Sequence, residues 1–280
     1  YALTGEQKYL DLAQRFNHRS LFGPLENHQD PLTGMHANTQ VPKIVGLARI
    51  AQLTQDATLL RGAAFFWETV VKNRSVVFGG NSVSEHFNDP QDFSRMIQHR
   101  EGPETCNTYN MLRLTEQLFT MDPQAAYADY YERALYNHIL ASIHPEKPAY
   151  VYFTSIRPDH YRVYSVPEVA FWCCVGTGME NTGLYGQFIY ALSEDGVYVN
   201  LFIPSTLPVA DRGLTLRQET RFPDESRTRI QLRLEAPATF TLHVRHPGWV
   251  QAGEFAVQVN GEAVNVESSP SSYAAIRREW

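Results

Sequence analysis

The stretch DGVYVNLFI, residues 195–203, marks a change in the hydrophobic period of the chain. Aliphatic residues take every second position from Val197 to Ile203, which is the period of a half-buried strand. The same period recurs in residues 230–234 and 240–244, and Asn260-Gly261 has the form of a hairpin turn. Before this stretch, apolar residues recur at helical spacing. The pattern therefore predicts an α + β multidomain chain, with a helical domain over residues 1–194 and a β-sandwich over residues 195–280.

Residues 1–194 carry several helix signals. A capping-box pattern at residues 4–7, Asp56, Pro103 and Asp122-Pro123 each predict a helix start. Further helices are expected at residues 42–53 and 177–192, and a short extended segment at residues 151–153. Successive helices joined by long polar loops indicate a helical toroid or bundle, with function carried on the loops.

Composition excludes some classes of partner. The 280 residues carry a net charge of −6 and no cluster of Lys and Arg, which argues against nucleic acid. No apolar run approaches the ~20 residues of a membrane span, so we expect a soluble protein with no membrane partner. The chain has 15 Tyr, 15 Phe and 4 Trp, which suits stacking on sugar rings but equally suits a packed core.

The termini suggest a fragment of a longer polypeptide. Tyr1 follows neither an initiator Met nor a secretion signal, and the last residues before Trp280 have the pattern of an interrupted strand. The compartment, periplasmic or cytoplasmic, and the oligomeric state are therefore open.

The three cysteines are placed unusually. Cys173 and Cys174 are adjacent, and Cys106 lies two positions after Glu104. Adjacent cysteines rarely form a disulfide with each other, because the geometry is strained, and an odd count does not suit a disulfide framework. Three thiols and a carboxylate are the right groups for one tetrahedral Zn²⁺ site. The alternative is that the cysteines are buried, inert thiols.

The two pairs of residues in this cluster are expected in different secondary structures. Glu104 and Cys106 lie at the start of a predicted helix, where the helix dipole favours anions and lowers a thiol's pKa. Cys173 and Cys174 are expected in a loop. There both can bind one metal only if the backbone bends, which the glycines at positions 176 and 178 permit.

Two further residues are candidates for sugar chemistry. A glycine pair precedes Glu85 in GGNSVSEHF (residues 79–87), which predicts an exposed loop acid of the kind that a general acid/base requires. A solvated loop carboxylate is the alternative. His36, in GMHANTQ (residues 34–40), lies where a loop meets a predicted helix, and its position alone favours a purely structural histidine over a sugar contact.

Together these segments resemble the β-L-arabinofuranosidases of glycoside hydrolase family 127 and its sister family 146. The resembling segments are HANTQVPK (36–43), GGNSVSEHF (79–87), DFSRMIQHREGPETCNTYNML (92–112), YERALYNHIL (131–140) and FWCCVGTGMEN (171–181). After residue 195 only the strand pattern and residues 245–249 agree. The resemblance implies part of an (α/α)₆ catalytic barrel, with earlier helices before residue 1, followed by an incomplete β-sandwich.

The resemblance also implies roles for residues. The family's Zn²⁺ ligands match Glu104, Cys106, Cys173 and Cys174. Its nucleophile matches Cys173, and its acid/base matches Glu85. Its sugar contacts match His36, Glu132 and Tyr152. The implied activity is a retaining glycoside hydrolase that releases β-L-arabinofuranosyl residues from plant-type glycans, so the expected partner is a carbohydrate substrate.

These roles are chemically coherent. A thiolate can replace the usual carboxylate nucleophile if it is ionised, and coordination to Zn²⁺ deprotonates a thiol. Three alternatives remain: a purely structural Zn²⁺ site, a helical-toroid sugar epimerase or isomerase, and a non-catalytic carbohydrate-binding protein. Glu85 distinguishes the hydrolase from two of these alternatives, because neither a structural Zn²⁺ site nor a binding protein requires it.

Overall fold

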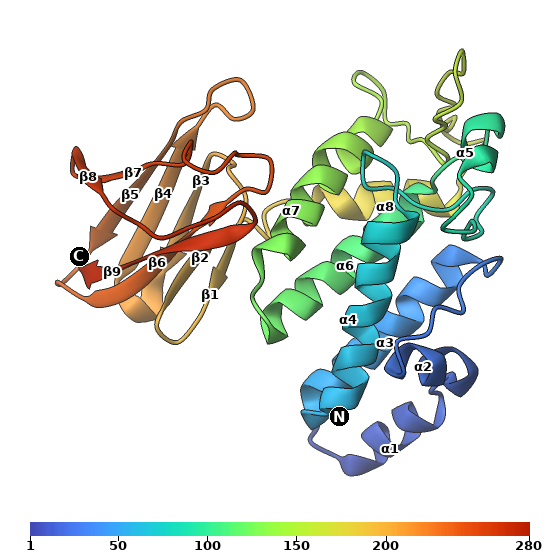
Figure 1. The fold of residues 1–280 in the computed structure, drawn as a ribbon, viewed down its shortest axis with the longest axis horizontal. Helices are drawn as coiled ribbons and strands as arrows, with labels where there is room; N and C mark the ends of the chain where they lie inside the picture. Colours follow the sequence, from blue (N-terminus) through green and yellow to red (C-terminus); the bar gives the residue numbers. More distant parts are fainter. The chain divides into compact units, whose positions relative to one another are not determined.

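The computed structural model describes residues 1–280, which form two compact units. Unit 1 comprises residues 1–123 and 130–183, and unit 2 comprises residues 124–129 and 184–280. Unit 1 is mainly helical and unit 2 mainly β-strand, as Figure 1 shows. The mixture of helices and sheets agrees with the change in hydrophobic period, and the boundary near residue 194 stays a prediction.

The helices of unit 1 pack through their apolar faces. Helix α3 (Ala37–Thr54) contacts α4 (Ala57–Thr69) and α6 (Thr105–Met121), and α6 also contacts α8 (Cys173–Thr182), as can be followed in Figure 1. Fully buried Ile44, Phe66 and Leu114 lie on these faces, and burying such a side chain stabilises the fold by about 1.5–3 kcal/mol. The other helical elements are α1 (Gln7–Arg15), α2 (Arg19–Glu26), α5 (Ser94–Gln98), α7 (Ala125–Ala134, whose first residues belong to unit 2), π-helical turns at Val70–Arg74 and Leu135–Ile139, and 3-10 turns at Leu140–Ser142 and, in unit 2, Ala210–Arg212.

Most helix starts follow the sequence signals. The Asp56 carboxylate caps α4 by accepting from the backbone N–H groups of Thr58 and Leu59, at 2.8 Å and 3.2 Å. The predicted capping box at residues 4–7 is wrong. Helix α1 begins at Gln7, and the Thr4 hydroxyl accepts from the Glu6 N–H instead of capping it.

Two predictions near the adjacent cysteines are wrong. Cys173 and Cys174 do not lie in a loop, because α8 begins at Cys173. Gly178 serves close packing rather than a bend, since a Cβ there would lie 2.2 Å from Tyr150 Cδ1. The helix also ends at Thr182 and does not reach residue 192. Residues 190–192 instead form β1, which pairs with the strand after it.

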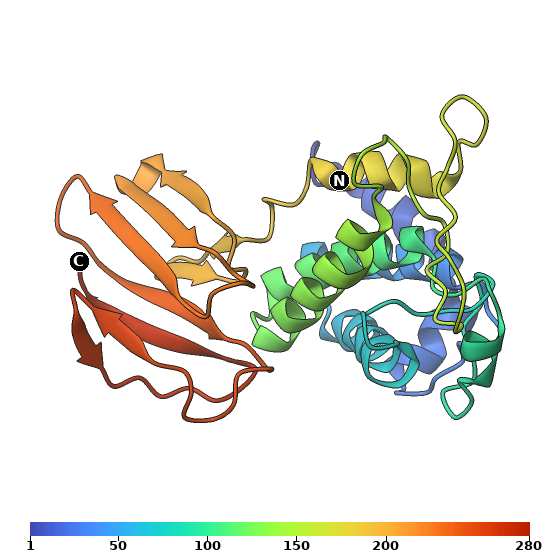
Figure 2. The ribbon, with the colours of Figure 1, turned by 90° about the horizontal axis from the view of Figure 1, so that it is seen from above.

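Unit 2 contains two larger sheets around one apolar cluster. The four-stranded sheet has the order β1-β2-β6-β9, in which only β2 and β6 are parallel. The three-stranded sheet has the order β3-β4-β5 and is antiparallel. Buried Val199, Leu216 and Leu242 come from both sheets and belong to the same cluster. The strands, which Figure 2 shows from a second direction, are β1 (Tyr190–Leu192), β2 (Gly196–Val199), β3 (Ser205–Val209), β4 (Leu214–Thr220), β5 (Thr228–Leu234), β6 (Thr239–His246), β7 (Val257–Val259), β8 (Glu262–Val264) and β9 (Ser272–Glu279).

Local chemistry sets the strand ends. The predicted hairpin turn is confirmed, since Asn260 and Gly261 join β7 to β8 with φ angles of 54° and 89°. Strand β2 stops at Val199, short of the predicted Ile203, because the Asn200 carbonyl accepts from the Arg245 side chain.

In unit 1, no helix combines the length and the apolar composition that crossing a bilayer requires.

Candidate active site

Four side chains with metal-binding atoms converge from the starts of two helices. Glu104 is the N-cap of α6 and Cys106 lies in its first turn, while Cys173 and Cys174 open α8. Their ligand atoms all lie within 4.8 Å of one another. Successive helical residues point about 100° apart, whereas successive strand residues point in opposite directions. The helix start therefore lets two adjacent cysteines face one centre, a result for which the sequence predicted a bent loop.

An extended segment holds the start of α6 in place. The Thr105 N–H donates to the Tyr152 carbonyl at 3.0 Å, and the Thr154 N–H donates to the Pro103 carbonyl at 2.9 Å. Residues Glu104 and Phe153 form an isolated β-bridge, which agrees with the predicted extended segment at residues 151–153. This pairing fixes the backbone of Tyr152 beside the cluster.

The spacing within the cluster suits a small cation. Cys173 Sγ lies 3.9 Å from both Glu104 Oε1 and Cys174 Sγ, close to the ~3.8 Å edge of a tetrahedron of metal–sulfur bonds. Cys106 Sγ and Cys174 Sγ are closer, at 3.1 Å, and share a hydrogen bond. Glu104 is 1% exposed, and its Oε2 is buried with no hydrogen-bond partner. A coordinated cation would satisfy that oxygen.

The pKa shifts of the four residues in the cluster also favour a bound cation. Burial, with smaller effects from Cys106 and Glu85, raises the pKa of Glu104 to about 8. The hydrogen bond between Cys106 and Cys174 lowers the pKa of Cys106 to about 6 and raises that of Cys174, and burial raises the pKa of Cys173. Four acidic groups at this spacing cannot all be ionised unless a cation lies among them. The cluster is thus able to hold a metal ion.

Three of the other candidate residues gather beside Cys173. Cys173 is exposed, whereas Cys106 and Cys174 are buried. The Tyr152 hydroxyl donates to Glu85 Oε1 and also interacts with the Cys173 thiol. Burial and the Glu85 hydrogen bond raise the pKa of Tyr152, so the phenol remains a proton donor. His36 Nε2 lies 3.6 Å from Glu85 Oε2. The phenol of Tyr152 therefore links the Glu85 carboxylate to the one accessible thiol, and the His36 imidazole lies next to that carboxylate.

The backbone that presents Glu85 is strained. Glu85, Ser84 and Ser82 have φ angles of 67°, 44° and 78°, in the left-handed region that costs a non-glycine residue about 1–3 kcal/mol. Hydrogen bonds hold the loop in this shape, because the Ala37 N–H donates to the Glu85 carbonyl at 2.7 Å and the Ser84 N–H to the Glu101 carbonyl at 2.9 Å. Strain that the surroundings maintain is concentrated at functional sites.

Comparison with known families identifies the chain. The sequence-family model named β-L-arabinofuranosidase, GH127 catalytic domain, matches residues 1–187. The family model of the GH127 middle domain matches residues 196–280. The chain belongs to glycoside hydrolase family 127. This confirms the resemblance carried by the sequence motifs, while the likeness to the sister family 146 stays a prediction.

Relatives of this GH127 chain are longer than it is. The non-reducing end β-L-arabinofuranosidase of Bifidobacterium longum subsp. longum is 27% identical, over 93% of this chain and 42% of its own. The crystal structure of Ara127N-Se, a GH127 β-L-arabinofuranosidase from Geobacillus stearothermophilus T6, matches with a TM-score of 0.82 and 23% identity, over 100% of this chain and 50% of its own. Another solved GH127 β-arabinofuranosidase matches with a TM-score of 0.81 and 23% identity, over 100% of this chain and 48% of its own. The chain thus spans about half the length of these relatives.

Some residues of the GH127 site could not be read from the sequence. Thr177 Oγ1 lies 3.2 Å from Cys106 Sγ, and Asn38 Nδ2 donates to Glu104 Oε1 at 3.1 Å. Thr177 follows Cys174 by three positions, a helical spacing that the loop interpretation concealed. Asn38 lies in the same motif as His36, but no spacing rule distinguishes it. Glu132 is buried on α7, and its predicted sugar contact stays a prediction.

Proposed function

We propose that the full-length protein is a retaining glycoside hydrolase that releases β-L-arabinofuranosyl residues from plant-type glycans. The observation that carries this proposal is the Tyr152 hydroxyl, which joins the Glu85 carboxylate to the one exposed thiol of the cysteine cluster, Cys173. Family membership supports the same substrate class. We also propose that unit 1 is part of an (α/α)₆ barrel and that unit 2 belongs to a β-sandwich.

We assign Zn²⁺ as the metal, held by Glu104, Cys106, Cys173 and Cys174, because three thiolates and one carboxylate form a typical zinc donor set. When bound, Zn²⁺ would ionise the thiols and orient the resulting thiolates. Cys106 and Cys174 are buried, which suits residues that only bind the metal. Cys173 is exposed, so a sugar can reach its sulfur.

The proposed reaction has two displacements. In the first, Cys173 Sγ bonds to the anomeric carbon, the bond from that carbon to the leaving oxygen breaks, and Glu85 gives its proton to that oxygen. In the second, Glu85 takes a proton from water, whose oxygen bonds to the anomeric carbon while the carbon–sulfur bond breaks. Two inversions at one carbon retain its configuration.

The remaining candidates orient these groups. Tyr152 donates a hydrogen bond to the Glu85 carboxylate, and His36 lies beside its other oxygen. We assign both side chains as sugar contacts, because Tyr152 interacts with Cys173 and His36 lies beside the proposed acid. Glu132 is the third proposed sugar contact.

Substitution of Glu85 by Gln in the full-length protein tests the proposal. We expect hydrolysis of an alkyl β-L-arabinofuranoside to fall by about 10²–10⁴-fold, because general acid catalysis is lost. Bound zinc should not change, because Glu85 is outside the ligand cluster. Glu101→Gln is the matched control, since it removes a neighbouring carboxylate and leaves the backbone carbonyl that holds Ser84.

Normal turnover by the Glu85→Gln variant would exclude the acid/base role of Glu85, whereas no hydrolysis by the unaltered full-length protein would favour a binding protein with a structural zinc site. Analysis of the released sugar separates hydrolysis from epimerisation, because an epimerase would convert the sugar without releasing the aglycone.

A further inference from the structure

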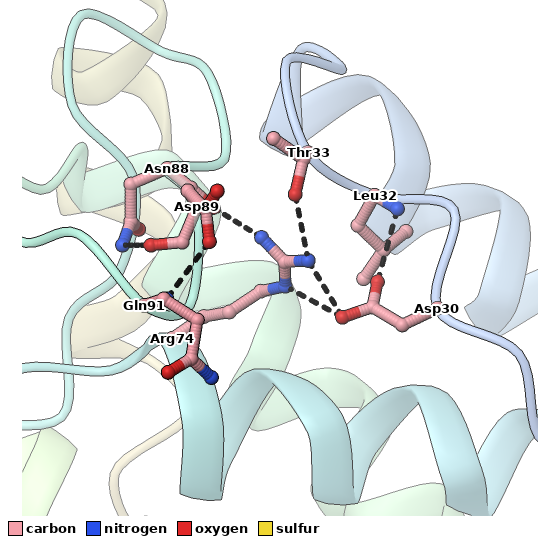
Figure 3. A network of polar contacts seen from close by, with 7 residues as sticks. All are labelled: Asp30, Leu32, Thr33, Arg74, Asn88, Asp89 and Gln91. Atoms are coloured by element: carbon pink, nitrogen blue, oxygen red, sulfur yellow. Dashed lines mark hydrogen bonds and ion pairs between the residues drawn. The ribbon is translucent and has the colours of Figure 1, made fainter.

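Arg74 forms a buried clamp between two segments of unit 1. It ends the π-helical turn after α4, and its side chain is 1% exposed. Figure 3 shows its guanidinium between Asp30 and Thr33 on one side and Asn88 on the other. Nη2 donates to Asp30 Oδ2 at 2.6 Å and to Thr33 Oγ1 at 3.1 Å, and Nη1 donates to the Asn88 carbonyl. The guanidinium carbon also lies 5.7 Å from the centre of the Phe87 ring.

The two clamped segments carry two of the candidate active-site residues. Asn88 follows Glu85 by three positions, and Thr33 precedes His36 by three. Backbone hydrogen bonds pair the segments between the clamp and the site. These bonds run from Gly34 N to Phe87 O at 2.9 Å, from Phe87 N to Met35 O at 2.9 Å, and from Ala37 N to Glu85 O at 2.7 Å. A displacement of Asn88 is therefore transmitted through a short ladder to Glu85.

Stability alone does not account for a charged clamp here. A buried ion pair is often no more stabilising than apolar side chains of the same volume, because both charges lose their hydration. A guanidinium that donates in several directions fixes geometry instead. Asp30 is itself oriented, since its Oδ1 accepts from the Leu32 N–H at 3.0 Å (Figure 3). Such a restraint is needed here because Ser84 and Glu85 have strained φ angles.

We propose that Arg74 is the positioning residue of the catalytic acid: it keeps the Glu85 carboxyl within reach of the leaving oxygen by clamping the Glu85 loop to the His36 segment. The proposal rests on the proposed acid/base role of Glu85. Arg74 acts through the Asn88 carbonyl and the paired backbone and does not touch the substrate.

The leaving group of the substrate provides the test. A dinitrophenyl arabinofuranoside departs with little need for a proton, whereas an alkyl arabinofuranoside needs one. In the full-length Arg74→Met variant, we expect kcat/KM to fall by about 100-fold for the alkyl substrate, since a ~1 Å misplacement of a catalytic group has that effect. The loss for the dinitrophenyl substrate should be much smaller. Arg74→Lys keeps the charge without the fork and should give an intermediate loss.

Arg245 in unit 2 provides a matched control. It is 0% exposed, and it donates to Asp129 at 2.5 Å and to the Asn200 carbonyl at 2.6 Å, with the Phe202 ring at 5.4 Å. Arg245→Met therefore removes the same kind of buried clamp from a segment without candidate catalytic residues. It should lower the rates on both substrates by one common factor.

Two outcomes separate the possible failures. Equal losses on both substrates for Arg74→Met, with a selective loss for Glu85→Gln, would overturn the positioning role and leave the acid intact. Equal losses for Glu85→Gln itself would overturn the acid/base assignment. If Arg74→Met does not fold, Thr33→Val removes one acceptor of the clamp at nearly constant volume. This milder variant should also lose more kcat/KM on the alkyl than on the dinitrophenyl substrate, although both losses are smaller. An equal loss on both substrates would overturn the proposal.

Discussion

Replacing Gly178 with alanine should loosen the cysteine cluster, although position 178 supplies no ligand. Gly178 lies in α8, four residues after Cys174. A Cβ at this position would lie 2.2, 2.6 and 2.8 Å from Cδ1, Cε1 and Cγ of Tyr150, whereas ordinary contacts begin at 3.4 Å. Three atoms of one ring are affected, so a small rotation of the ring cannot relieve all of them.

The size of the effect follows from this overlap. Relief of the shortest contact requires α8 and Tyr150 to separate by about 1.2 Å, and overpacking of this kind costs about 1–3 kcal/mol. Alanine regains about 0.5–1 kcal/mol over glycine within a helix. The free energy of unfolding should therefore fall by up to about 2.5 kcal/mol. Cys173 and Cys174 should move with the helix, away from Cys106.

Position 176 provides the comparison, because a Cβ at Gly176 meets nothing within 4 Å in the same helix. Gly176→Ala should raise the free energy of unfolding by about 0.5–1 kcal/mol. Chemical denaturation measures both stabilities, and transfer of zinc to a coloured chelator measures how firmly the cluster holds the metal. Zinc should leave faster from Gly178→Ala and at the normal rate from Gly176→Ala. The same stability and zinc release for both variants would refute the idea that packing against Tyr150 positions the cysteines.

Tyr152→Phe should lower kcat/KM by about 10- to 100-fold, because a hydrogen bond to a charged group contributes about 1.5–3 kcal/mol; unchanged steady-state kinetics would contradict the contact with Glu85. His138 is buried with its Nδ1 2.8 Å from Thr108 Oγ1, and burial lowers its pKa from 6.5 to about 3. Only the unfolded state takes up this proton between those values. The stability is therefore complete above pH 6.5 and falls as the pH drops toward 3, by at most about 5 kcal/mol. His138→Gln should flatten the pH dependence measured by denaturation, and an unchanged slope would contradict the assignment.

The sequence predicts the helical and β regions well where the apolar residues keep one period. In β2, buried Val197 and Val199 flank the more exposed Tyr198, as the alternation predicts. In β6, neighbouring Thr241 and Leu242 are both buried, so burial there does not follow the alternation of residues 240–244. The start of helix α8 escaped prediction because Gly176 and Gly178 weaken the local helix signal there. Gly178 also packs against Tyr150, a contact between separate segments that no local pattern shows.

The candidate site likewise contains some residues that the sequence indicated and others that it could not indicate. Residue type and the family resemblance together indicated the four members of the cluster, and the structure brings Glu104, Cys106, Cys173 and Cys174 together. The residues that orient them depend on tertiary contacts. Asn38 and Glu104 are 66 positions apart, and Arg74 and Asp30 are 44 apart. No local pattern can pair residues over such distances.

The sulfur of Cys173 as the nucleophile is the central claim, and trapping the covalent intermediate tests it most directly. The full-length Glu85→Gln variant, mixed with the dinitrophenyl arabinofuranoside, should form the first bond without an acid and then stall, because no base activates water. Intact-mass measurement and peptide mapping should find one arabinosyl group on Cys173. An adduct on any other residue, or turnover with no adduct, would contradict the mechanism.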